Sequence, residues 1–100
     1  MRDLLFSIER LEFVGSGQTL LAGRCCRDPM RTGDEAQLMV FREEDGRLEK
    51  SESISFSFPE FEFYGRKIRE LDSGHTAGVL IPNEVATKLR FGWYLKGQNA

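Results

Sequence analysis

The side chains best suited to nucleophilic, redox or metal chemistry are two adjacent cysteines and a single histidine. Cys25 and Cys26 point to opposite faces of an extended strand, and a disulfide between such neighbours would be strained. A metal site would need further soft ligands, yet His75 lies about fifty residues further along the chain. We therefore expect two free thiols with a structural role, with redox activity as the alternative, and neither a metal nor a cofactor.

Motifs that mark common catalytic sites are missing from the sequence. It contains no GxSxG nucleophile turn, no phosphate-binding P-loop, and no GxGxxG, HExxH or CxxC. His75 follows Asp72-Ser73-Gly74, a run of turn-forming residues, so we predict a surface turn residue and not a general base. Glu60 and Glu62 are spaced for the solvent-facing side of a strand. We therefore expect that the protein is not an enzyme.

The remaining candidates are aromatic and basic residues that could contact a partner. Aromatic rings can stack on the bases of single-stranded RNA, although phenylalanines in a small β domain more often form its core. Three basic residues within four positions could contact phosphate or an acidic protein surface. Glu70 and Asp72 follow directly, so a solvated edge of alternating charge is the alternative. The candidate interaction surface comprises Phe61, Phe63, Arg66, Lys67, Arg69 and Trp93.

Composition limits the class of protein that carries these residues. The chain has 100 residues, 40% of them hydrophobic, and 14 basic against 16 acidic side chains give a formal net charge of −2. This balance argues against bulk nucleic-acid binding, which needs a surplus of Lys and Arg. No apolar run approaches the roughly 18 residues of a membrane span, and charges interrupt residues 1–12, where a signal peptide would be apolar. We expect one domain over residues 1–100, located in the cytoplasm and without a membrane partner.

Frequent glycines and alternating apolar residues predict short strands and not long helices. Residues 37–57 form the clearest hairpin candidate, because Asp45-Gly46 fits a two-residue turn. Within residues 54–58 apolar side chains occupy every second position, as in a strand with one buried face. After Pro59 the apolar positions move from even to odd numbers, which predicts a bulge or bend at this proline.

Two segments allow alternative interpretations. Near the N-terminus, Asp3 could cap a helix over the following apolar positions, but the same residues read equally well as strands. Near the C-terminus, Asn83 is spaced to act as the N-cap of a short helix that runs to Leu89 and stops at Gly92. This is the one helix that we expect.

The order of these elements resembles a known family. The first half contains a strand, a glycine turn, a second strand of the pattern Thr-apolar-apolar-x-Gly-Arg, and an Arg-x-Gly-Asp turn into a third strand. This order resembles the second domain of elongation factor Tu and other translational GTPases. The matching segments are residues 7–14, 17–25, 30–35, 38–40, 65–74, 77–81 and 90–95.

The resemblance implies an all-β fold, a small six-stranded antiparallel Greek-key barrel of the translation-factor domain 2 type, with one short helical turn near the C-terminus. It also favours strands at the N-terminus. In the family this domain helps to hold the aminoacyl end of tRNA. Of the positions that do so Glu9 matches, whereas Arg10, Glu12, Gly17 and Ala22 differ. The resemblance therefore carries over neither aminoacyl-tRNA binding nor, without a phosphate-binding loop, GTPase activity.

These observations lead to one expected function and several alternatives. We expect a stand-alone, non-catalytic β-barrel interaction module that binds a protein or ribosomal RNA surface, its partner being a ribosome-associated or another unidentified protein. The alternatives are a small-molecule barrel of the flavin-binding type and an accessory subunit of an enzyme. Homo-oligomerisation through residues 56–63 is a further alternative.

Overall fold

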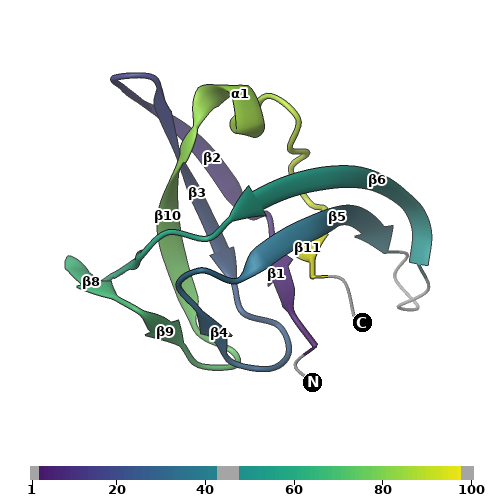
Figure 1. Cartoon of the computed structure of the whole chain (residues 1–100), viewed down its shortest axis with the longest axis horizontal. Coiled ribbons are helices and arrows are strands. Elements are labelled where there is room, and N and C mark those ends of the chain that lie inside the picture. Colours follow the sequence, from purple (N-terminus) through teal and green to yellow (C-terminus); the bar gives the residue numbers. More distant parts are fainter. Residues whose placement is uncertain (1–2, 43–47, 98–100) are drawn as a thin grey trace.

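The computed structural model describes residues 3–42 and 48–97, which form eleven β-strands and one short helix (Figure 1). No helix in these two ranges is long and apolar enough to cross a membrane. In chain order the elements are β1 (Leu5–Ser7), β2 (Arg10–Gly15), β3 (Gln18–Arg24), β4 (Met30–Arg31), β5 (Glu35–Arg42), β6 (Leu48–Ser57), β7 (Phe61–Phe63), β8 (Arg66–Ile68), β9 (Glu70–Leu71), β10 (Thr76–Pro82), α1 (Asn83–Ala86) and β11 (Tyr94–Lys96).

The strands form three antiparallel sheets. One sheet has the order β1-β11-β5-β6, the second has the order β2-β3-β10-β7-β8, and β4 pairs with β9. The all-β class and the N-terminal strands are confirmed. The six-stranded closed barrel is wrong, because the described residues form eleven strands and their sheets do not close.

Bends in the chain explain why the strands are more numerous than expected. The first expected strand is divided in two, since Ile8 and Glu9 donate their main-chain N–H groups to carbonyl groups of two separate segments. Similarly, β6 ends at Ser57 in one sheet and β7 begins in the other sheet, which confirms the bend predicted at Pro59. The chain changes sheet at these bends, and β1, β2, β6 and β8 remain as the edge strands of the two larger sheets.

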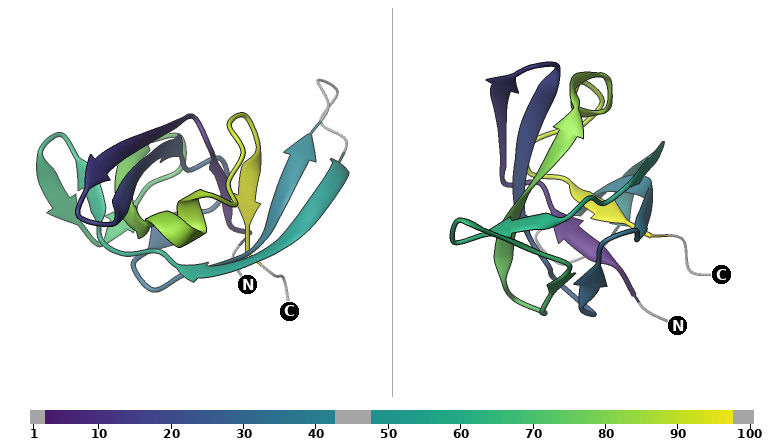
Figure 2. Two further views of the ribbon diagram at one scale, coloured as in Figure 1. Left: turned by 90° about the horizontal axis from the view of Figure 1, so that it is seen from above. Right: turned by 60° about the vertical axis from the view of Figure 1, so that its left-hand side comes forward.

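Strands β5 and β6 form a long hairpin that extends away from the other strands (Figure 2). Ile54 and Phe58 are buried and Phe56 is half-buried, so the predicted alternation is confirmed. The expected turn at Asp45-Gly46 lies outside the described residues.

Three phenylalanine rings form the centre of the core. Phe6 meets Phe58 edge-on with ring centroids 5.4 Å apart, and Phe58 stacks with Phe61 at 6.1 Å. All three side chains are almost completely buried, and each such burial stabilises the fold by about 2 kcal/mol. Because β1 and β7 belong to different sheets, these rings join the two sheets through their side chains.

The main chain also joins the two sheets, at Gly23. A Cβ atom built at this glycine would lie 1.8 Å from the main-chain oxygen of Ser7 and 2.6 Å from the Phe6 ring. Around this contact Phe6 forms a bridge with Cys25, and the N–H of Arg24 donates to the Ser7 hydroxyl at 2.9 Å. Only glycine lets two backbones approach so closely, so β1 can cross β3 here because residue 23 lacks a side chain.

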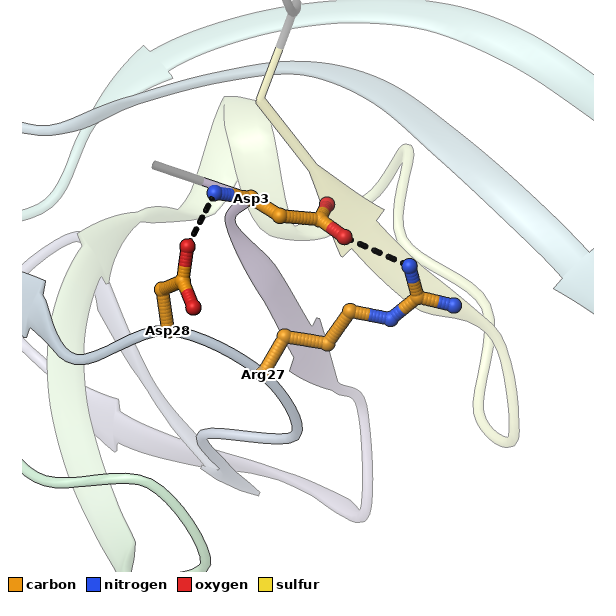
Figure 3. A network of polar contacts seen from close by, with 3 residues as sticks. All are labelled: Asp3, Arg27 and Asp28. Carbon is orange, nitrogen blue, oxygen red and sulfur yellow. Dashed lines mark hydrogen bonds and ion pairs between the residues drawn. The ribbon is translucent and has the colours of Figure 1, made fainter. Parts of the chain in front are cut away.

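Polar contacts hold the beginning of β1 in place (Figure 3). The Asp3 carboxylate pairs with the Arg27 guanidinium at 2.5 Å, and the Asp3 N–H donates to the Asp28 carboxylate at 2.7 Å. Asp3 therefore binds the loop after β3 and caps no helix, because the residues that follow it form strands.

The short helix α1 lies at one end of β10 (Figure 1). A helix near the C-terminus is confirmed, but Pro82 occupies the N-cap position and Asn83 is the first helical residue. The helix also ends at Ala86, before Leu89. The side chain of Asn83 does not cap the helix. Its amide oxygen accepts a hydrogen bond from the Thr19 hydroxyl at 2.7 Å, and this bond connects α1 to the β2–β3 hairpin.

We predict that Gly23→Ala destabilises the protein by about 3 kcal/mol, because its Cβ meets a main-chain oxygen that cannot move aside. The matched control is Gly78→Ala in the neighbouring strand β10. Its Cβ would meet the flexible end of Leu20 at 2.8 Å, and we expect a cost below about 1 kcal/mol. Urea denaturation measures the free energy of unfolding of both variants. Equal losses of stability in Gly23→Ala and Gly78→Ala would show that the main chains of β1 and β3 are not in close contact at Gly23.

Candidate functional site

The candidate interaction residues centre on the hairpin of β7 and β8. Its strands pair Phe61 with Ile68 and Phe63 with Arg66, and two residues, Tyr64 and Gly65, form the turn. Both turn residues have positive φ, 49° and 76°, which is the requirement of a type I′ turn. The strand pairing therefore places a basic side chain directly opposite an aromatic one at the tip of an edge hairpin.

Tyr64 is the most exposed large hydrophobic residue among those that the structure describes, with 91% of its surface accessible. Type I′ turns favour Asn, Asp or Gly at this position, and a bulky residue at positive φ is strained by about 1–2 kcal/mol. Its ring meets Phe63 edge-on at 4.5 Å between centroids, and it buries little of itself there. The chain thus carries a solvent-exposed ring at a place where folding alone favours a smaller residue.

A second pair of rings continues this aromatic surface. Phe63 is half-buried and lies parallel to His75, with centroids 5.6 Å apart and 14° between the planes. His75 is exposed in the turn before β10, so the prediction of a surface turn residue is confirmed. A shallow hollow of about 190 Å³ lies beside these rings, lined by Ala22, Glu62, Phe63, Tyr64, Thr76 and Ala77.

The three basic candidates differ in their surroundings. Arg66 and Lys67 are exposed on the edge strand β8, and neither forms an ion pair within the described ranges. Arg69 is exposed too, but its guanidinium lies 3.6 Å from the Glu60 carboxylate. Two cations at the hairpin are therefore available to a partner, while the third is partly neutralised by its neighbour.

The structure does not bring the other two candidates to this surface. Phe61 is fully buried, because it faces inward against Phe58, and it cannot touch a partner. Trp93 is half-buried near β11 in the other sheet, where its ring contacts Phe41 at 5.6 Å and Arg90 at 5.0 Å. The hairpin site consists of Phe63, Tyr64, Arg66, Lys67 and His75, with Arg69 beside it.

A larger hollow lies between the β2–β3 hairpin and α1. It measures about 340 Å³ and is lined by Leu11, Phe13, Thr19, Asn83, Ala86 and Thr87. Its size is at the lower end of that of ligand pockets. The small-molecule alternative therefore remains a hypothesis.

The two thiols face different environments, as predicted from their adjacency. Both cysteines are free, Cys25 is buried and Cys26 is exposed. Burial raises the pKa of the Cys25 thiol, and the Asp28 carbonyl accepts a hydrogen bond from it at 3.1 Å. No group of three or more His, Cys, Asp and Glu side chains that could hold a metal occurs in the part of the chain that the structure describes.

The candidate surface expected from the sequence leaves out two members of the hairpin site, although Tyr64 is among the aromatic residues that could stack on RNA bases. Tyr64 stands between Phe63 and Gly65, and the signal that could have identified it is a two-residue turn between alternating strands, with glycine in one of its places. His75 gave no such signal, because only the pairing of β7 with β10 brings it to Phe63.

Comparison with solved structures shows a similar fold over the whole chain. Translation elongation factor SelB from Methanococcus maripaludis matches both in its apo form and in complex with the GTP analogue GppNHp. Each match has a TM-score of 0.68 and 13% sequence identity, and covers 100% of this chain and 21% of SelB. At this identity the similarity shows the fold, and it confirms the resemblance to the second domain of translational GTPases. No family model and no curated protein matches the sequence.

We predict that a maleimide labels one thiol of the native protein rapidly, because Cys26 is exposed and Cys25 is buried. Cys26→Ser should abolish rapid labelling, whereas Cys25→Ser should leave it. Mass spectrometry of timed samples counts the labelled thiols, and denatured protein supplies the reference with both labelled. Equal labelling rates of the two native thiols would show that Cys25 is accessible.

Proposed function

We propose that this chain is a non-catalytic interaction module that binds RNA of the translation machinery through the β7–β8 hairpin. The observation that carries the proposal is the exposed Tyr64 ring, held at positive φ beside Arg66 and Lys67. Strained residues persist where the surrounding structure supports them, and they concentrate at binding and active sites.

The chemistry of the hairpin fits an unpaired nucleotide segment. An exposed aromatic ring can stack on a base, and basic side chains beside it can contact the phosphates on either side. Phe63 and Arg66 lie opposite each other across the strands, so the ring surface and the cation face the same side of the hairpin. A nucleotide stacked near Phe63 would lie within reach of this guanidinium.

Charge determines how such binding would work. The chain is weakly acidic overall, so the general electrostatic attraction that drives non-specific nucleic-acid binding is small. Arg66 on the ring side of the hairpin and Lys67, which pairs with Glu62 on its other side, would act locally at the tip. Together they would supply about two phosphate contacts, while stacking supplies most of the affinity. This mode is compatible with the fold of a translation elongation factor domain, which the chain shares with SelB.

We predict that Tyr64→Gly weakens binding of a single-stranded RNA of about twelve nucleotides by about 1–3 kcal/mol, because it removes one stacking surface. Glycine is favoured at this turn position, so thermal stability should stay equal or rise by up to about 1 kcal/mol. Fluorescence anisotropy with labelled RNA measures the affinity, and thermal denaturation measures the stability.

The matched control for this change is Ser16→Gly. Ser16 also has positive φ, 54°, and also precedes a glycine in a two-residue hairpin turn, but it lies between β2 and β3, outside the hairpin site. It should leave RNA affinity unchanged. Unchanged affinity in Tyr64→Gly, or no RNA binding by the parent protein at low salt, would refute the proposed site; recovery of a protein partner alone would assign the surface to proteins.

We predict that binding weakens with salt according to two phosphate contacts, with a slope of log affinity against log salt of about −1.4. Arg66→Ala and Lys67→Ala should each reduce the slope by about 0.7, since each removes one cation. Lys88→Ala, an exposed lysine after α1, is the control and should change nothing. A slope that neither hairpin variant alters would show that these cations do not contact phosphate.

A further inference from the structure

The free edge of β2 has properties that the hairpin site does not use. β2 is the last strand of its sheet opposite β8, and no strand in the described ranges pairs with its outer side. Natural edge strands are usually protected from pairing by charged side chains, lysine above all, by proline, by a bulge or by a covering segment. β2 has no lysine or proline, its two charges are of opposite sign, and its irregular pairing with β3 lies between Phe13 and Gly15, beyond Leu11. The strand Arg10–Gly15 is exposed or half-exposed along its whole length.

We propose that two copies of this chain associate by antiparallel pairing of their β2 strands. The charges on β2 indicate that its pairing partner is the β2 strand of a second copy of this chain. Arg10 and Glu12 flank Leu11, and their side chains are 66% and 56% exposed and 3.6 Å apart. These two opposite charges are placed symmetrically about a central apolar residue.

Two-fold symmetry converts this pattern into complementarity between copies. If Leu11 faces Leu11 of the second copy, Arg10 faces Glu12 of that copy, and Glu12 faces its Arg10. Both cross-strand pairs then join opposite charges, each of which stabilises antiparallel strands. Centring the pair on Glu12 would instead place two like charges directly opposite, so the charges select one register.

The apolar residues of β2 favour the same pairing. Leu11 and Phe13 lie on one face of the strand, and Phe13 is 70% exposed. In the register centred on Leu11, the Phe13 ring of each copy is the diagonal neighbour of Leu11 of the other. The exposed ring would therefore become partly covered on the face opposite the charges.

The paired sheets would leave the hairpin site free. β2 and β8 are opposite edges of the same sheet, so each dimer would carry one β7–β8 hairpin at either end of a continuous sheet of both copies. The proposal does not depend on RNA binding. Association and RNA affinity can be measured separately, and the failure of one leaves the other intact.

Sedimentation velocity over about a hundredfold range of protein concentration tests the proposal. The parent protein should shift reversibly from monomer to dimer. Arg10→Glu and Glu12→Arg should each weaken association by at least about tenfold, because each places like charges opposite one another. The double variant Arg10→Glu/Glu12→Arg should restore it, since exchanging the two charges recreates both cross-strand pairs.

The control is Arg31→Glu, which breaks an exposed ion pair with Glu70 away from β2 and should not affect association. Thermal denaturation at low concentration verifies that each variant folds. A parent protein that stays monomeric throughout the range overturns the proposal, as does an association that the single charge reversals do not weaken. Association that the double variant fails to restore overturns the register centred on Leu11.

Discussion

The close contact of β1 with β3 at Gly23 determines how the two larger sheets are joined. At this point the main chain of Ser7 and the ring of Phe6 occupy the space of a side chain. Without the contact, β1 could not pair with β11 in one sheet while bridging to Cys25 at the end of β3 in the other. The same crossing places Phe6 against Phe58, and so determines how the two sheets enclose their common core.

The position of the hairpin site depends on this arrangement through a series of packed rings. Phe58 is held by Phe6 and stacks in turn on Phe61, the first residue of β7. With Phe61 buried, the alternation of the strand brings Phe63 to the same face nearer the tip, and the two-residue turn then projects Tyr64 into solvent. The buried rings thus stabilise a hairpin whose strained tip contributes little to the core.

Much of the fold follows from local pattern in the sequence. Alternation over residues 54–58, the interruption at Pro59 and the opposite faces of Cys25 and Cys26 depend on neighbours along the chain, and all three are confirmed. The errors involve distant contacts. Barrel closure depends on which edges meet, and Asn83 fills a capping pattern but bonds to Thr19 instead. For the site, the exposure of Arg66 and Lys67 agrees with the alternating charges around them, but the burial of Phe61 and the stacking of His75 depend on tertiary packing.

We propose the exposed tyrosine hairpin as an RNA-binding surface. Titration of the isotopically labelled protein with single-stranded RNA, followed residue by residue by nuclear magnetic resonance, tests it most directly. The signals of Tyr64, Arg66, Lys67 and His75 should move together and saturate with one affinity. Signals that move only around β2 and α1, or that do not move at all, would contradict it.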